Sequence, residues 1–144
     1  MSITHIGIDP GMSGGIAWIS DGVACAVKMP ETHRDILDVF MEIRREGPCF
    51  AMLEFVHAMP AQGVKSVWTF GKGYGALEMG LTAAEIPFDH VTPQKWQKAL
   101  GCLTKGIKNV SKARAQELFP SLKITHANAD ALLICEYNRR TKQP

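Results

Sequence analysis

Short apolar runs broken by turn-forming residues dominate the first thirty positions of the chain. Residues 3–9 are mostly apolar and end at Pro10-Gly11, and a second run covers residues 15–19. Asp21-Gly22 then separates this run from residues 23–28, and this dipeptide between two apolar runs is typical of a two-residue hairpin. The pattern therefore predicts three consecutive antiparallel strands at the start of the chain.

After the third strand the apolar spacing changes from strand-like to helical. Thr32 and Asp35 are spaced as a variant capping box, and the apolar positions that follow share one helical face up to Gly47-Pro48. A short apolar run at 49–54 ends in a carboxylate and predicts a fourth strand. Further along, the pattern predicts a helix at 65–84, a fifth strand at 88–91, and helices at 93–100, 110–118 and 127–140.

This order of elements predicts the fold class. A strand, helix, strand crossover makes its two strands parallel, whereas the opening hairpins are antiparallel. We therefore expect an α/β fold in which a mixed five-stranded sheet is flanked by helices, which is the arrangement of RNase H-like proteins. The 144 residues are enough for one core, and we expect a single domain over residues 1–144.

Charge is distributed unevenly along the chain. Residues 1–91 hold 6 basic against 11 acidic side chains, a net charge of −5, whereas residues 92–144 hold 10 against 3, a net charge of +7. Clustered lysines and arginines bind polyanions by releasing phosphate counterions. The last third of the chain is therefore expected to form a nucleic-acid-binding surface, although a solvated basic face that maintains solubility would give the same pattern.

Composition narrows the function classes further. Hydrophobic residues make up 46% and charged residues 21%, as in globular proteins, and no apolar run approaches the length of a membrane span. The first residues lack the pattern of a secretory leader, so we expect a cytoplasmic location. The four cysteines are scattered without zinc-site spacing and are expected to be reduced thiols.

Three acidic residues stand where a functional site is expected. Asp9 ends the first strand, Glu54 ends the fourth, and Asp130 lies near the start of the last helix. Several carboxylates at the end of a rigid sheet are the oxygen ligands with which Mg²⁺-dependent enzymes hydrolyse phosphodiesters. Asp9 could instead start the Pro-Gly turn, and Asp130 could interact only with the helix dipole. Glu54 is harder to explain structurally, because burying a carboxylate without a partner is costly.

The residues around these acids resemble four motifs of phage-type RuvC Holliday junction resolvases, which belong to the RNase H-like nuclease superfamily. Ile-Gly-Ile-Asp-Pro-Gly at 6–11 resembles the first motif, and Met-Leu-Glu-Phe-Val-His-Ala-Met-Pro at 52–60 resembles the second. Residues 91–100 resemble the segment before the basic region, and residues 129–134 resemble the closing metal-binding helix. The four blocks occur in the family's order and cover nearly the whole chain.

The resemblance implies that Asp9, Glu54 and Asp130 are catalytic metal ligands for Mg²⁺ or Mn²⁺, with two ions per site. It also implies a further acid about one turn before Asp130, and this acid is missing. His126 lies four residues before Asp130, so the two would share a face if both were helical. We expect His126 to be the fourth catalytic residue, with Asn128 as the alternative oxygen donor.

Two groups of residues are expected to contact DNA. The loop after Glu54 corresponds to one that reaches the branch point in RuvC-like proteins, so Phe55, His57 and Met59 are candidates to wedge or stack there, with loop packing as the alternative. Five lysines are placed to contact phosphates: Lys95, Lys98, Lys105, Lys108 and Lys112. Trp96, between them, is expected to belong to the core.

The resemblance implies an endonuclease that resolves four-way or branched DNA by two-metal phosphodiester hydrolysis, leaves 5′-phosphate ends, and takes part in DNA recombination and repair. Two symmetric cuts imply a C₂ homodimer, with the helix at 65–84 as a candidate interface. The glycines at 71, 73 and 75 are expected to allow close helix packing or approach to the DNA backbone. The alternatives are an RNase H-like nuclease acting on RNA or flaps, and a nucleic-acid-binding module weakened by the missing acid.

Overall fold

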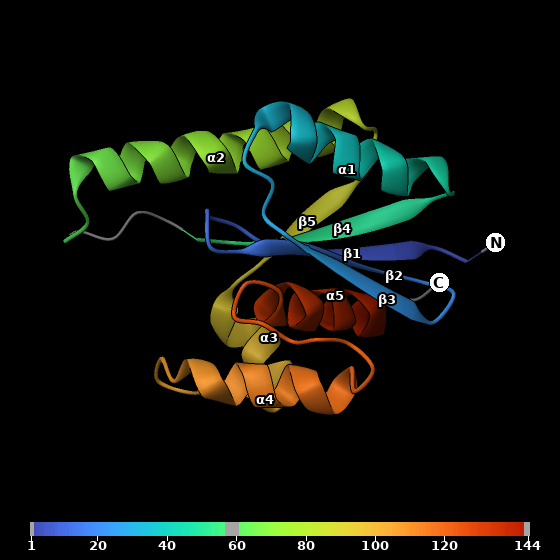
Figure 1. Ribbon diagram of the computed structural model, residues 1–144, viewed down its shortest axis with the longest axis vertical. Helices are drawn as coiled ribbons and strands as arrows, with labels where there is room; N and C mark the ends of the chain where they lie inside the picture. The colour runs from blue at the N-terminus through green and yellow to red at the C-terminus, as the bar shows by residue number, and fades with distance from the viewer. Residues whose placement is uncertain (1, 57–60, 143–144) are drawn as a thin grey trace.

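The computed structural model describes residues 2–56 and 61–142, and its centre is a five-stranded sheet in the order β3-β2-β1-β4-β5 (Figure 1). β1 pairs antiparallel with β2, and β2 with β3, whereas β1–β4 and β4–β5 are parallel. The predicted mixed sheet with three antiparallel opening strands is therefore confirmed. The strands are β1 Thr4–Asp9, β2 Gly15–Ser20, β3 Val23–Lys28, β4 Cys49–Glu54 and β5 Phe88–Val91.

Helices cover both faces of the sheet (Figure 1). α1 (His33–Arg45) and α2 (Val64–Ala83) lie on one face, and α3 (Pro93–Ala99), α4 (Lys108–Leu118) and α5 (Ala129–Thr141) lie on the other. The capping pattern was predicted correctly, because the Thr32 hydroxyl accepts a hydrogen bond from the Asp35 amide. None of the helices in the described residues is long and apolar enough to cross a membrane.

α5 is the central helix of the second layer, because it packs directly on β1. Gly7 permits this approach: a Cβ atom there would lie 2.4 Å from the carbonyl oxygen of Ala131 and 2.2 Å from the amide nitrogen of Cys135. Asn138 secures the same contact, since its side-chain amide donates to the carbonyls of Ile6 and Phe50, at 2.9 Å each. The position of α5 relative to β1 and β4 is thus fixed by backbone contact and by hydrogen bonds.

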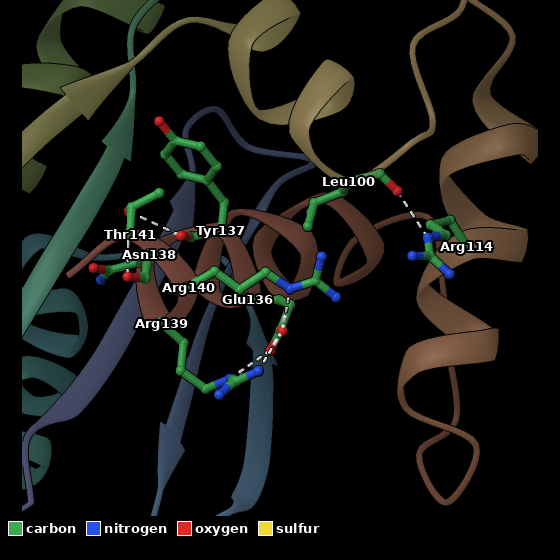
Figure 2. Close-up of polar contacts among 8 residues, drawn as sticks. All are labelled: Leu100, Arg114, Glu136, Tyr137, Asn138, Arg139, Arg140 and Thr141. Carbon is green, nitrogen blue, oxygen red and sulfur yellow. Dashed lines mark hydrogen bonds and ion pairs between the residues drawn. The ribbon is translucent and has the colours of Figure 1, made fainter. Parts of the chain in front are cut away.

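Polar contacts hold the outer part of this layer together (Figure 2). Arg114 of α4 donates through Nε to the Leu100 carbonyl at the end of α3, at 2.8 Å, which attaches α4 to α3. The basic helix α4 is therefore attached to the same layer as α3 and α5.

Within α5, the mostly buried Glu136 accepts hydrogen bonds from both Arg139 and Arg140. These two arginines hold the pKa of Glu136 below its usual value despite its burial.

Candidate active site

The three predicted carboxylates come from three elements that meet at one end of the sheet. Asp9 and Glu54 are the last residues of two adjacent parallel strands, β1 and β4, whose register pairs Ile8 with Leu53 just before them. Asp130 lies in the first turn of α5, which packs against β1. Parallel strands end at the same edge of a sheet, so the topology brings these positions together.

The electrostatics of the three acids show that they share one environment. Burial, together with the charges of Glu54 and Asp130, raises the pKa of Asp9 to about 8. Burial raises the pKa of Glu54 to about 7, with Asp130 contributing in the same direction. The pKa of Asp130 is also raised by burial. Each acid is thus destabilised as an anion, and none of them forms an ion pair among the described residues.

Glu54 is the most constrained of the three. Its side chain is only 7% exposed, and one carboxylate oxygen accepts a 2.7 Å hydrogen bond from the indole Nε1 of the fully buried Trp96. This bond opposes the rise in the pKa of Glu54. Tyr74 of α2 donates to the Glu54 backbone carbonyl at 2.9 Å. The strand end is therefore held from both faces of the sheet, and the Glu54 carboxylate has one fixed donor.

A cleft runs from the acids to the basic segment of the chain. Asp9 and Asp130 line it with His126, Lys108 and Ser111, and Glu54 is not among its lining residues. Lys108, the first residue of α4, lowers the pKa of both Asp9 and Asp130. Lys108 therefore supplies positive charge to two partly buried acids, and the cleft connects them to the start of α4.

The predicted start of the last helix was wrong by two residues, and this changes the relation of His126 to Asp130. α5 begins at Ala129, not at residue 127, so His126 lies in the preceding turn and does not share a helical face with Asp130. It nevertheless lines the same cleft, and its charge lowers the pKa of Asp130. Asn128 holds the turn before α5: its side-chain oxygen accepts from the Thr125 amide, and its side-chain nitrogen donates to the Lys123 carbonyl.

The donor chemistry at this end of the sheet suits a hard divalent cation, because three coupled carboxylates lack an ion-pair partner. Their side chains are not assembled into a coordination cage, however. In the described parts of the chain, no three His, Cys, Asp or Glu side chains are arranged to hold an ion. The acids that fit the cation are thus gathered by the fold, and side-chain rotation would have to complete the site.

The predicted DNA-contacting residues are only partly covered by the structure. Lys95 and Lys98 are exposed on α3, Lys105 is exposed in the connection to α4, and Lys112 is half-buried on α4. Phe55 directly follows β4 with 48% of its surface exposed, and its ring lies edge-on to that of His90. The other two residues predicted to reach the branch point, His57 and Met59, lie outside the described residues.

Sequence reasoning missed two features of the site. Trp96 was correctly assigned to the core, but its hydrogen bond to Glu54 crosses 42 residues of sequence and has no local signal. Lys108 was predicted as a phosphate contact only, and its influence on the acids depends on how α4 packs against α5. Its position just after Gly106, at the start of a helix lined with basic residues, gave no indication of this second role.

Comparisons with known proteins support the fold. The chain is similar to a solved Thermus thermophilus RuvC structure, with a TM-score of 0.62 and 19% identity over 92% of this chain and 91% of that one. It is also similar to T. thermophilus RuvC in complex with Holliday junction substrate, with a TM-score of 0.65 and 18% identity over 93% and 90%. No family model and no curated protein matches the sequence. The predicted resemblance to RuvC is therefore confirmed for the fold.

Proposed function

We propose that this protein is a metal-dependent endonuclease that cuts four-way or branched DNA. The observation that carries the proposal is the convergence of Asp9, Glu54 and Asp130 at one end of the sheet. Among the described residues these acids have no ion-pair partner, and Asp9 and Asp130 line a cleft together with Lys108. A RuvC fold supports the choice of substrate, because one of the similar structures holds a Holliday junction.

The protein's own groups would prepare the reaction in three ways. Trp96 orients the Glu54 carboxylate, Asp9 stands at the carboxyl end of β1, and Asp130 is carried by the first turn of α5. Two divalent cations, Mg²⁺ or Mn²⁺, would be held by these acids and would supply water activation and charge stabilisation at the leaving 3′ oxygen. The products would carry 5′ phosphates.

Lys108 and His126 would favour the ionised form of the acids at this site. Both lower the pKa of Asp130, and Lys108 also acts on Asp9, so they favour the ionised carboxylates that a cation requires. His126 also lines the wall of the cleft, next to the same acids.

DNA would approach along the basic side of the second layer. Lys95, Lys98 and Lys105 are exposed on or beside α3, on the same layer as the cleft, and lysines there would neutralise phosphates whatever the base sequence. Phe55 extends from the strand that carries Glu54 and would stack on an unpaired base at the branch. The chain therefore offers both charge and an aromatic ring next to the acids.

Two symmetric cuts call for a homodimer, and α2 offers a surface for it. Its first half carries exposed apolar residues, with Trp68 72% exposed, and a Cβ atom on Gly71, Gly73 or Gly75 would meet nothing within 4 Å. Among the described residues, these glycines therefore permit no close packing against another helix of the same chain, and the expected packing or approach to DNA would involve a partner molecule. Small residues beside an exposed tryptophan instead leave room for the backbone of a second protomer.

The decisive experiment is cleavage of a labelled four-way junction in Mg²⁺ or Mn²⁺ by the wild type and by Glu54→Gln. We expect paired symmetric nicks with 5′-phosphate ends, and a loss of at least about a hundredfold in the variant, since removing one group that stabilises transition-state charge has costs of this order. Lys123→Gln, which changes an exposed lysine outside the cleft, is the matched control and should cut as the wild type does.

Other substrates in the same assay separate the alternatives. Cutting of an RNA–DNA hybrid or a flap in preference to the junction would assign the protein to RNase H-like nucleases of another specificity. Junction binding without cutting in either metal would indicate a binding module. The absence of the further acid expected about one turn before Asp130 is the observation that favours the binding module.

A further inference from the structure

The two edges of the sheet differ in how well they are protected. β5 has four residues and carries exposed Asp89 and His90, whereas β3 has six residues with a single charge, Lys28, at its end. β3 pairs residue for residue with β2, without a bulge, and contains no proline. Proteins usually block an exposed edge with charges, proline, bulges or a covering element. Residues 23–27 contain no charge, no proline and no bulge.

The sequence of this edge is symmetric about its middle. Val23, Ala24, Cys25, Ala26 and Val27 read the same in both directions. If two copies of β3 pair antiparallel around a two-fold axis at Cys25, each residue faces a residue of the same type. Ala24 faces the partner's Ala26, and Val23 faces the partner's Val27. A strand with this symmetry is complementary to itself, as a two-fold interface requires.

The hydrogen-bond pattern between β2 and β3 is also compatible with a two-fold axis at Cys25. The Met29 amide donates to the Gly14 carbonyl opposite it, at 2.9 Å, and bonded pairs alternate along an antiparallel ladder. Counting along the register, Cys25 bonds inward to Trp18, whereas the backbone groups of Ala24 and Ala26 face the open edge. Pairing centred on Cys25 therefore places each free amide opposite a free carbonyl of the partner's strand.

We propose that the β3 edge is a self-association surface on which β3 of a second copy pairs antiparallel about Cys25. The register also brings Lys28 beside the partner's Asp21-Gly22 turn, so the only charge on the strand meets a carboxylate. Cys25 and the partner's Cys25 then face each other as a pair that exchanges no backbone hydrogen bonds, and the Cα atoms of such a pair lie about 4.5 Å apart. The partner is thus a second copy of this chain, recognised by backbone pairing and by the symmetric sequence.

This contact does not depend on the proposed nuclease activity and differs from the dimer expected for it. Within each sheet β1 and β3 run in the same direction, because each is antiparallel to β2. Antiparallel pairing of the two β3 strands therefore makes the two β1 strands antiparallel as well. The two ends that carry Asp9 and Glu54 then point in opposite directions. A pair formed through β3 would therefore join two nuclease units without placing both sites on one junction.

The first test uses Cys25 as a reporter, because the other three cysteines are buried. Diamide accepts two electrons and two protons while the two thiols form a disulfide, and the expected Cα separation suits that bond. We expect the Cys25 cross-link to form at least about tenfold faster than a collisional one, owing to the high effective concentration of paired thiols. The collisional rate comes from Cys25→Ser combined with Ser121→Cys, an exposed position.

The second test removes one outward donor. Ala26→Pro deletes an amide that faces the open edge and leaves the inward bonds of Cys25 and Val27 in place, which edge strands tolerate. We expect this variant to cross-link Cys25 at the collisional rate with an unchanged circular dichroism spectrum. In the wild type, the Ala24 and Ala26 amides should exchange hydrogen more slowly as the protein concentration rises.

Three results would overturn the proposal. The first is a Cys25 cross-linking rate equal to that of the surface control, and the second is a rate that Ala26→Pro leaves unchanged. The third is amide exchange at Ala24 and Ala26 that is the same at every protein concentration, which needs no variant and so does not depend on Ala26→Pro folding. Junction cleavage is not a readout in any of these tests, so failure here leaves the proposed function unaffected.

Discussion

At the scale of single residues, the dominant feature is the electrostatic cost of placing three carboxylates close together where they are partly or fully buried. Asp9, Glu54 and Asp130 each have a raised pKa, so the fold stabilises their protonated forms. A group whose pKa is higher in the folded than in the unfolded state stabilises the protein below its unfolded pKa, and this contribution is lost as the pH rises through the folded value. For Asp9 that window runs from about 4 to about 8.

Asp9→Asn tests this cost directly. Without divalent cations, the variant should be more stable than the wild type at pH 8 by about 1 to 3 kcal/mol. The difference should shrink as the pH falls and disappear only below about pH 4, where Asp9 becomes protonated in the unfolded state as well. Urea denaturation in a chelator, followed across this pH range, measures the effect. Adding Mg²⁺ should stabilise the wild type but not the variant. A variant less stable than the wild type at pH 8 would contradict the expectation.

Trp96→Phe tests what the hydrogen bond to Glu54 contributes while the Glu54 carboxylate itself is kept. The change removes the indole donor to Glu54, which costs about 1 to 3 kcal/mol of unfolding free energy because a buried acceptor loses its partner. Since that bond lowers the pKa of Glu54, its loss should raise this pKa further and move the acidic limb of the cleavage profile to higher pH. A lower rate with an unmoved acidic limb would mean that Trp96 acts through packing alone.

At the scale of elements, the contact between α5 and β1 decides where Asp130 stands. Gly7→Ala would force a methyl group into the backbone of α5 at Ala131 and Cys135, and we expect a loss of about 3 kcal/mol from overpacking. Gly73→Ala is the matched control, since its Cβ atom would meet nothing within 4 Å and alanine favours a helix by up to about 1 kcal/mol. Thermal unfolding of both variants measures the difference, and equal effects would contradict the assigned contact.

At the scale of the whole molecule, the opposed charges of the two parts of the chain govern binding to DNA. The net charge of +7 in residues 92–144 lies mainly in the layer of α3, α4 and α5, so junction affinity should fall steeply as salt is added. Lys95→Gln and Lys98→Gln should each reduce the slope of log Kd against log salt by about 1. Fluorescence anisotropy of Glu54→Gln with a labelled junction measures this slope. Unchanged slopes would place the DNA elsewhere.

The local patterns were sufficient for the order of elements. Asp21-Gly22 specified its hairpin, in which both residues have positive φ, and Thr32 specified the start of α1. The acid at the end of each buried strand was also visible in the sequence, because a charged residue that closes an apolar run is unusual. Prediction failed at the start of α5, where Asn128 forms a turn with Thr125 instead of extending the helix to residue 127.

The sequence by itself therefore determined the strands, the helices and the three acids, since each depends on neighbours within a few residues. Only the tertiary structure decided what surrounds those acids. The Trp96 hydrogen bond, the charge of Lys108 beside Asp9, and the close contact at Gly7 all join positions far apart in the chain. Such contacts follow from how whole elements pack, and no periodicity or local spacing encodes them.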